Sequence, residues 1–146
     1  MNNTRVYLAF KHTPPGGFWM SAFHWITAFR LVTRYPHGGI VQGGWLYHTK
    51  LSTGARRERF DDNPGWDLFD TGSDADMEEV FRELEGNPYD VFGLLAFILP
   101  WRISDSSRMY CYKLMWRMVT GQNPRFKVVP ETLLAWAAQQ QAGNRA

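Results

Sequence analysis

The chain contains a single cysteine, Cys111, among its 146 residues. One thiol cannot form an intramolecular disulfide, and it cannot supply a zinc site that needs several cysteines. The fold must therefore be stabilised by apolar packing. Hydrophobic residues make up 45% of the chain and aromatic residues 16%, which is enough for one well-buried core. We expect a single domain covering residues 1–146, with a polar tail from about residue 141.

The balance of charge argues against nucleic acid as a partner. Sixteen Lys and Arg residues stand against fourteen Asp and Glu residues, which leaves a formal charge of +2. The one basic cluster is Arg56, Arg57 and Arg59, and Asp61 and Asp62 follow it at once. A mixed charge run of this kind is typical of a solvated loop, so we predict a loop here and no nucleic-acid binding.

The apolar segments are too short for a transmembrane helix. The longest, Val91 to Trp101, has eleven residues, whereas roughly 20 are needed to cross a bilayer. We expect it to be buried in the core. The first residues run directly into a strand-like segment, without the apolar stretch of a signal peptide. We therefore expect a cytoplasmic protein, with association with a virion as an alternative location.

Two short strand-like runs flank Gly43-Gly44, a pair suited to a tight hairpin turn. The first run covers residues 39–42 and the second residues 45–48. His37 then stands just before one strand and His48 lies on the next. Other segments have strand-like or helix-like periodicity: we predict strands at 6–10, 66–70 and 126–129, and helices at 18–33, from Asp74 or Asp76 to Glu85, around Cys111 and at 131–140.

Cys111 falls in the early part of a predicted helix that ends near Gly121. Leu114, Met115 and Met118 form its apolar stripe. A thiol becomes a nucleophile when its thiolate is stabilised, and a helix N-terminus and a nearby imidazole both do this. The alternative is that Cys111 is a small buried apolar residue.

His37 and His48 are candidates for that imidazole. They are eleven residues apart across the predicted hairpin, so neighbouring strands bring both rings to one edge of a sheet. One ring could take the proton of Cys111 while the other fixes its tautomer, as in a catalytic triad. We predict His37 as the base and His48 as the orienting residue. The alternative is two ordinary strand-end histidines; His12 and His24 have no comparable arrangement.

The order of these motifs resembles that of the circularly permuted papain-like hydrolases, which include lecithin retinol acyltransferase-like enzymes and permuted NlpC-type amidases. In that family a base histidine precedes a strand, a second polar residue lies on the next strand, and the nucleophilic cysteine opens a helix. One departure is that Tyr112 and Lys113 follow the cysteine, where bacterial members often have Ser-Glu. The resemblance is carried by His37-Gly-Gly-Ile-Val, Trp45-Leu-Tyr-His48, Gly86-Asn-Pro-Tyr89-Asp90 and Met109-Tyr-Cys111.

The resemblance implies an α+β fold, in which a small antiparallel sheet or open barrel packs against helices and the cysteine starts a helix. It implies a thiol hydrolase or acyltransferase in which Cys111 attacks an amide or ester carbonyl. Small members of this kind also occur in phage and prophage genomes. A peptidoglycan-type amide, an isopeptide and a lipid ester all fit this chemistry. No metal or organic cofactor is expected.

A second hypothesis is a catalytically silent binding or assembly module of the same fold, for example a phage tail or virion component with protein partners. The Tyr112-Lys113 departure and the seven Trp residues motivate it, since aromatic residues are enriched at interfaces.

Overall fold

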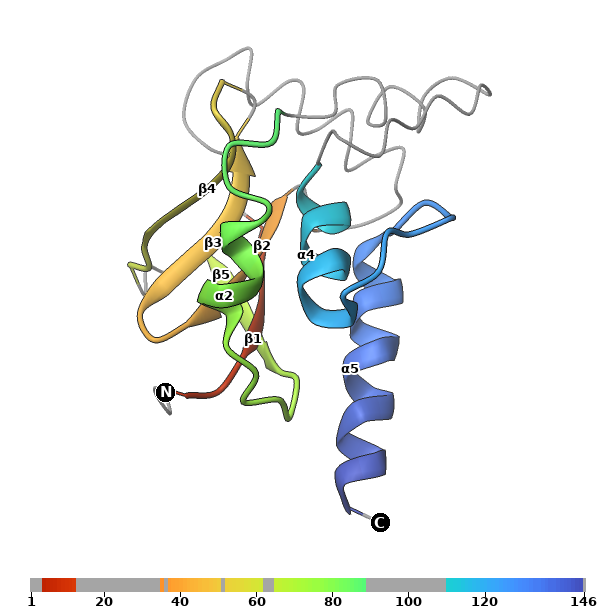
Figure 1. Cartoon of the computed structure of the whole chain (residues 1–146). Coiled ribbons are helices and arrows are strands. Elements are labelled where there is room, and N and C mark those ends of the chain that lie inside the picture. The colour runs from red at the N-terminus through yellow and green to blue at the C-terminus, as the bar shows by residue number, and fades with distance from the viewer. Residues whose placement is uncertain are drawn as a thin grey trace.

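The computed structural model describes residues 4–12, 35, 37–50, 52–61, 65–88 and 110–145. The predicted helix at 18–33, the apolar segment at 91–101 and the Tyr89-Asp90 motif lie outside these residues. The described part of the chain forms a sheet with helices packed against it (Figure 1). The expected α+β class is confirmed, while the permuted papain-like topology stays a prediction.

The sheet is open and antiparallel, with the strand order β4-β3-β2-β1-β5 (Figure 1). Every neighbouring pair is antiparallel, and β1 lies between β2 and β5. The strands predicted at residues 6–10 and 66–70 are confirmed as β1 and β5. The strand bounds are β1 Tyr7–Lys11, β2 His37–Gln42, β3 Trp45–Lys50, β4 Gly54–Arg59 and β5 Trp66–Asp70.

The predicted hairpin is confirmed, and its glycines explain its geometry. Gly43 and Gly44 have φ angles of 59° and 79°, the left-handed values that a type I′ turn requires at both central positions. Most other residues would be strained there. The turn sets the register in which Gln42 pairs with Trp45 and Gly39 pairs with His48.

The predicted loop at the basic cluster is wrong, because Gly54–Arg59 forms the edge strand β4, paired with β3. Two side chains on the same face of this strand contact Trp45: the guanidinium groups of Arg57 and Arg59 lie 5.0 and 4.3 Å from the centroid of its ring. The two guanidinium groups thus form cation–π contacts with the indole ring. Charged residues also suit an edge strand, because they discourage pairing with another chain.

The predicted strand at residues 126–129 is also wrong, because the segment does not join the sheet. Val128 is fully buried, and its backbone N–H donates a hydrogen bond to the Tyr110 hydroxyl over 3.1 Å. Its β-branched side chain therefore reflects burial beside the helices rather than pairing in a ladder. Pro130 follows directly and starts the last helix.

Three helices lie in the described part of the chain, and their ends differ from the predictions. The first, α2 (Met77–Arg82), is shorter than predicted and begins after Asp76, whose carboxylate accepts two first-turn N–H groups. The second, α4 (Cys111–Thr120), opens at the cysteine and ends at Gly121. The third, α5 (Pro130–Arg145), continues through the segment that was expected to be a tail.

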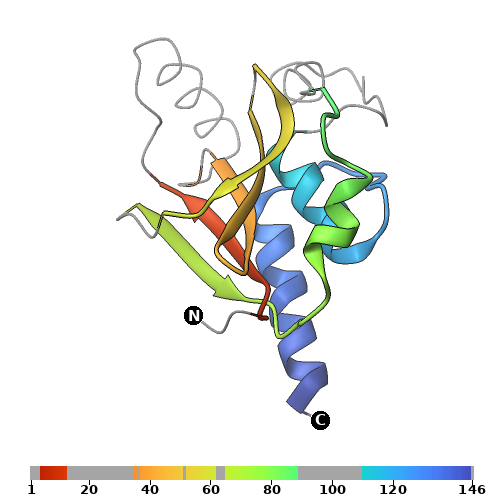
Figure 2. The ribbon, with the colours of Figure 1, turned by 60° about the vertical axis from the view of Figure 1, so that its left-hand side comes forward.

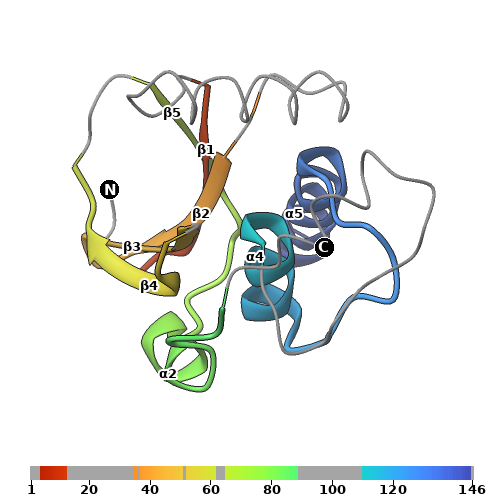
Figure 3. The same cartoon turned by 90° about the horizontal axis from the view of Figure 1, so that it is seen from above.

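The helices cover one face of the sheet. Seen from above, α4 lies between the sheet and α5 (Figure 3), and α5 extends past the sheet toward the C-terminus (Figure 2). The predicted apolar stripe of α4 is confirmed, since Leu114, Met115 and Met118 are all buried. Along β1, Leu8 and Phe10 face this core, whereas Ala9 belongs to a smaller cluster.

Gly38 allows α4 to approach β2 closely. A methyl group at this position would lie 2.9 Å from the Sδ atom of Met115, 3.0 Å from the Tyr112 ring and 3.2 Å from the carbonyl oxygen of Ala9. All three contacts are shorter than ordinary van der Waals distances. The absence of a side chain at residue 38 therefore sets the spacing between strand and helix.

We predict that Gly38→Ala lowers the free energy of unfolding by about 1–3 kcal/mol, because overpacking forces the helix or its side chains to shift. Urea unfolding measures this change. Gly143→Ala is the matched control, since a methyl group there meets nothing within 4 Å. It should be neutral, or stabilising by up to about 1 kcal/mol through helix propensity. Equal stability of Gly38→Ala and the wild type would contradict the close-packing argument.

Candidate active site

The structure brings the two predicted site histidines into direct contact. Nε2 of His37, the first residue of β2, lies 3.0 Å from Nδ1 of His48 on β3. The two rings meet edge to face with centroids 5.3 Å apart. The Trp66 ring packs against the His37 ring, with centroids 6.0 Å apart. His48 is only 3% exposed, so one member of the pair is fully buried.

A third group, Glu58, extends this pair and was missed from the sequence. Its Oε1 atom lies 3.2 Å from Nε2 of His48. Its Oε2 atom lies 2.7 Å from Nζ of Lys50 and 3.8 Å from Nη2 of Arg56. Glu58 pairs with Leu46 across β3 and β4 and so shares a face of the sheet with His48. This relation could not be predicted while β4 was interpreted as a loop.

Burial keeps His48 neutral. It lowers the pKa of His48 to about 4, although the charge of Glu58 acts in the opposite direction. For Glu58, burial raises the pKa, but the Lys50 hydrogen bond and the charges of Lys50 and Arg56 lower it more. The net pKa of Glu58 lies below its usual range. A neutral imidazole thus faces an ionised carboxylate at neutral pH.

Cys111 is the first residue of α4 and is 4% exposed. Burial raises the pKa of its thiol to about 12, and the backbone N–H groups of Gly38, Tyr112 and Cys111 itself lower it by less. The helix N-terminus therefore favours the thiolate, as expected from the sequence, but desolvation is the larger effect. The resting thiol is neutral at neutral pH.

The relation between Cys111 and the histidines follows from the alternation of β2. Position 38 faces α4, where the backbone N–H of Gly38 points to the thiol. Position 39 points to the opposite face, toward Leu46 and His48. The side chains of the histidine pair therefore lie on the face of the sheet that is opposite α4. Because His37 is the first residue of its strand, its ring stands at the end of the sheet. An approach of the Cys111 Sγ atom to His37 around this strand end stays a prediction.

Tyr112, which departs from the family pattern, has a clear structural role. Its ring is 2% exposed and packs against Phe10, with ring centroids 6.3 Å apart. Its hydroxyl donates a hydrogen bond to the backbone carbonyl of Tyr35, two residues before His37. The contact ties the cysteine helix to the chain that enters β2. Lys113 is buried as well, at 2% exposure.

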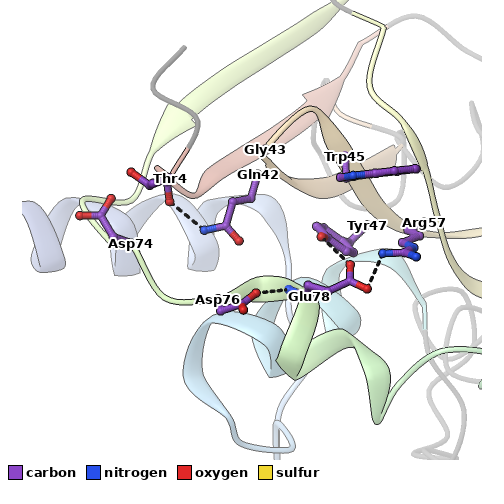
Figure 4. Close-up of a pocket in the computed structure, with 9 residues that line it drawn as sticks. All are labelled: Thr4, Gln42, Gly43, Trp45, Tyr47, Arg57, Asp74, Asp76 and Glu78. Atoms are coloured by element: carbon purple, nitrogen blue, oxygen red, sulfur yellow. Dashed lines mark hydrogen bonds and ion pairs between the residues drawn. The ribbon is translucent and has the colours of Figure 1, made fainter.

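A hollow of about 510 Å³ lies at the other end of the hairpin, at the Gly43 turn (Figure 4). None of the three predicted site residues lines it. Its carboxylate Glu78 accepts a hydrogen bond from the Tyr47 hydroxyl over 3.0 Å and forms an ion pair with Arg57. Gln42 donates to the Thr4 and Ala75 carbonyls. These polar groups bind one another and dock α2 on the sheet.

In the part of the chain that the structure describes, no three His, Cys, Asp or Glu side chains are grouped so that they could hold a metal ion. None of the helices in the same residues combines the length and the apolar character that crossing a bilayer requires. Comparisons of the chain with protein-family models, with curated proteins and with solved structures find no match.

The burial of His48 predicts a loss of stability in mild acid. An unfolded histidine takes up its proton near pH 6.5, whereas folded His48 does so only near pH 4. Protonation therefore favours the unfolded chain as the pH falls through this window, by up to about 3 kcal/mol. Above pH 6.5 His48 is neutral in both the folded and the unfolded chain, so this loss of stability is absent there.

We predict that His48→Gln removes this part of the pH dependence, whatever its effect at neutral pH. Unfolding by urea at several pH values between 6.5 and about 4 measures it. His12→Gln is the control, since the His12 side chain is 48% exposed. Equal slopes in the wild type and His48→Gln would mean that His48 is not buried as a neutral ring.

Proposed function

We propose that this protein is a thiol acyl-transfer enzyme, a hydrolase or an acyltransferase, that acts on an amide or ester carbonyl through Cys111, His37 and His48. The observation that carries the proposal is the 3.0 Å contact between His37 Nε2 and His48 Nδ1 at the end of β2 where α4 begins. A base that is held by a second polar group is two thirds of a catalytic triad, and the proposal takes Cys111, at the start of α4, as the third member that reaches His37 around the end of β2.

The proposal gives each nitrogen of His37 a separate role. Nε2 of His37 is engaged with His48, so Nδ1 is the nitrogen that accepts the Cys111 proton. Sγ then bonds to the carbonyl carbon and the carbonyl π electrons move to oxygen. The backbone N–H of Cys111 at the helix N-terminus donates to that oxyanion. When the intermediate collapses, the leaving amine or alcohol takes the proton from His37 and an acyl thioester remains.

The second half of the reaction regenerates the thiol. Water, or an acceptor alcohol or amine, gives its proton to His37 Nδ1 as it attacks the thioester carbonyl. The Sγ atom leaves and recovers that proton. Whether water or another acceptor is used decides between hydrolase and acyltransferase.

The raised pKa of Cys111 fits proton removal during the attack rather than a thiolate formed in advance. In this respect the site resembles a serine nucleophile with its histidine base. Because the thiol is buried, a substrate carbonyl can reach Sγ only when the groups that cover this atom move aside.

The same burial favours a second candidate, the catalytically silent binding or assembly module. A neutral thiol at 4% exposure is what a purely structural cysteine would have. In that case the cysteine serves only to pack the first turn of α4 against Gly38. The two candidates differ in whether Cys111 can be acylated.

We predict that p-nitrophenyl acetate acylates Cys111 in the native protein, which intact-mass and peptide mass spectrometry detect. Cys111→Ala should abolish this adduct and leave the fold intact, because it removes one small side chain. His37→Ala should slow acylation by about 100-fold or more, since it removes the base. His48→Gln should slow it less, because an amide can partly replace the orienting ring.

His12→Gln controls for the general effect of losing a histidine and should leave the acylation rate unchanged. Acylation that persists at the same rate in His37→Ala would show that His37 is not the base. A native protein without any adduct at Cys111 would leave the silent module as the better candidate.

A further inference from the structure

Nε2 of His48 is a buried ring nitrogen that forms no well-aligned hydrogen bond within the described residues. An acceptor, the Oε1 atom of Glu58, lies 3.2 Å away. A buried polar atom of this kind requires a partner. The contact is short enough that a small rotation of the carboxylate would align it.

We propose that Glu58 is a positioning residue that fixes the tautomer of both histidines and thereby leaves His37 Nδ1 without a proton. The inference rests on the proposed role of His37 as the base. It adds a residue on β4 to a site that the sequence placed on β2, β3 and the cysteine helix.

A carboxylate accepts hydrogen bonds and cannot donate one, so the neutral His48 ring carries its proton on Nε2, facing Glu58. Nδ1 of His48 is then an acceptor. The 3.0 Å contact requires a donor on the other side, so His37 carries its proton on Nε2. The second nitrogen of His37, Nδ1, is left with a lone pair.

The surroundings of Glu58 suit this role. Lys50 and Arg56 both approach Oε2, at 2.7 and 3.8 Å, whereas His48 faces Oε1. The two cations keep the group ionised and restrain the carboxylate, and one oxygen remains directed at the imidazole. His37 is the next titratable group along this face. An acid without these cations could become protonated, and it would then offer a donor that permits the opposite tautomer.

The test uses Glu58→Met, which keeps the side-chain length and removes the acceptor. The first readout is the tautomer of His48, from the ¹⁵N chemical shifts of labelled histidine in the intact protein at neutral pH. The second is the rate of Cys111 acylation by p-nitrophenyl acetate, in the wild type and in a His48→Gln background. Glu79→Met is the matched control, since Glu79 lies exposed on α2.

We expect the wild-type His48 proton on Nε2 and a measurable shift toward Nδ1 in Glu58→Met. We expect acylation to slow at least about tenfold, and Glu58→Met to add less than about twofold once His48 is Gln. Glu58→Gln retains an acceptor oxygen and should recover part of the rate. Glu79→Met should change neither readout.

Two results would overturn the proposal. One is an unchanged His48 tautomer in Glu58→Met. The other is a loss of rate in Glu58→Met that is as large in the His48→Gln background as in the wild type, since Glu58 would then act independently of His48. If the wild type forms no adduct at Cys111, the proposed function fails and the tautomer alone decides the role of Glu58.

Discussion

The contact between His37 and His48 depends on the register of one hairpin. Gly43 and Gly44 form a tight turn that pairs Gly39 with His48, and this pairing places the two rings on the same face of the sheet. A slip by one residue would move His48 to the opposite face. The position of Glu58 depends on a second register, that of β4 with β3, in which Leu46 pairs with Glu58 and His48 pairs with Arg56. The two registers together determine the polar chain.

Burial gives this site its chemical character and also limits it. Desolvation keeps His48 neutral, and only a neutral ring can accept a hydrogen bond from the Nε2–H group of His37. The same effect raises the pKa of Cys111 above its usual range, despite the backbone N–H groups at the start of α4. In the proposed reaction the site does not store a thiolate, and His37 removes the proton of Cys111 during the attack. Gly38 permits the close approach that buries the thiol.

Local chemistry allowed the sequence to predict the hairpin, strands β1 and β5, the stripe of α4 and the proximity of His37 and His48. The glycine pair and the apolar spacing act over a few residues, and so they are readable in one dimension. The strand β4 was missed because its charges find their partners across the sheet, on Trp45, Lys50 and His48. The segment at 126–129 was mistaken for a strand because Val128 is buried by helices. Glu58 could not be found before β4 was known.

In the proposed mechanism His37 presents an unprotonated Nδ1 to Cys111 while its Nε2–H donates to His48. The ¹⁵N spectrum of labelled histidine at neutral pH tests this most directly, with Cys111→Ala compared to the wild type. We expect a proton on Nε2 of His37, an unprotonated Nδ1, and a change in the Nδ1 shift when the thiol is removed. A proton on Nδ1 of His37, or an Nδ1 shift that Cys111→Ala leaves unchanged, would contradict it.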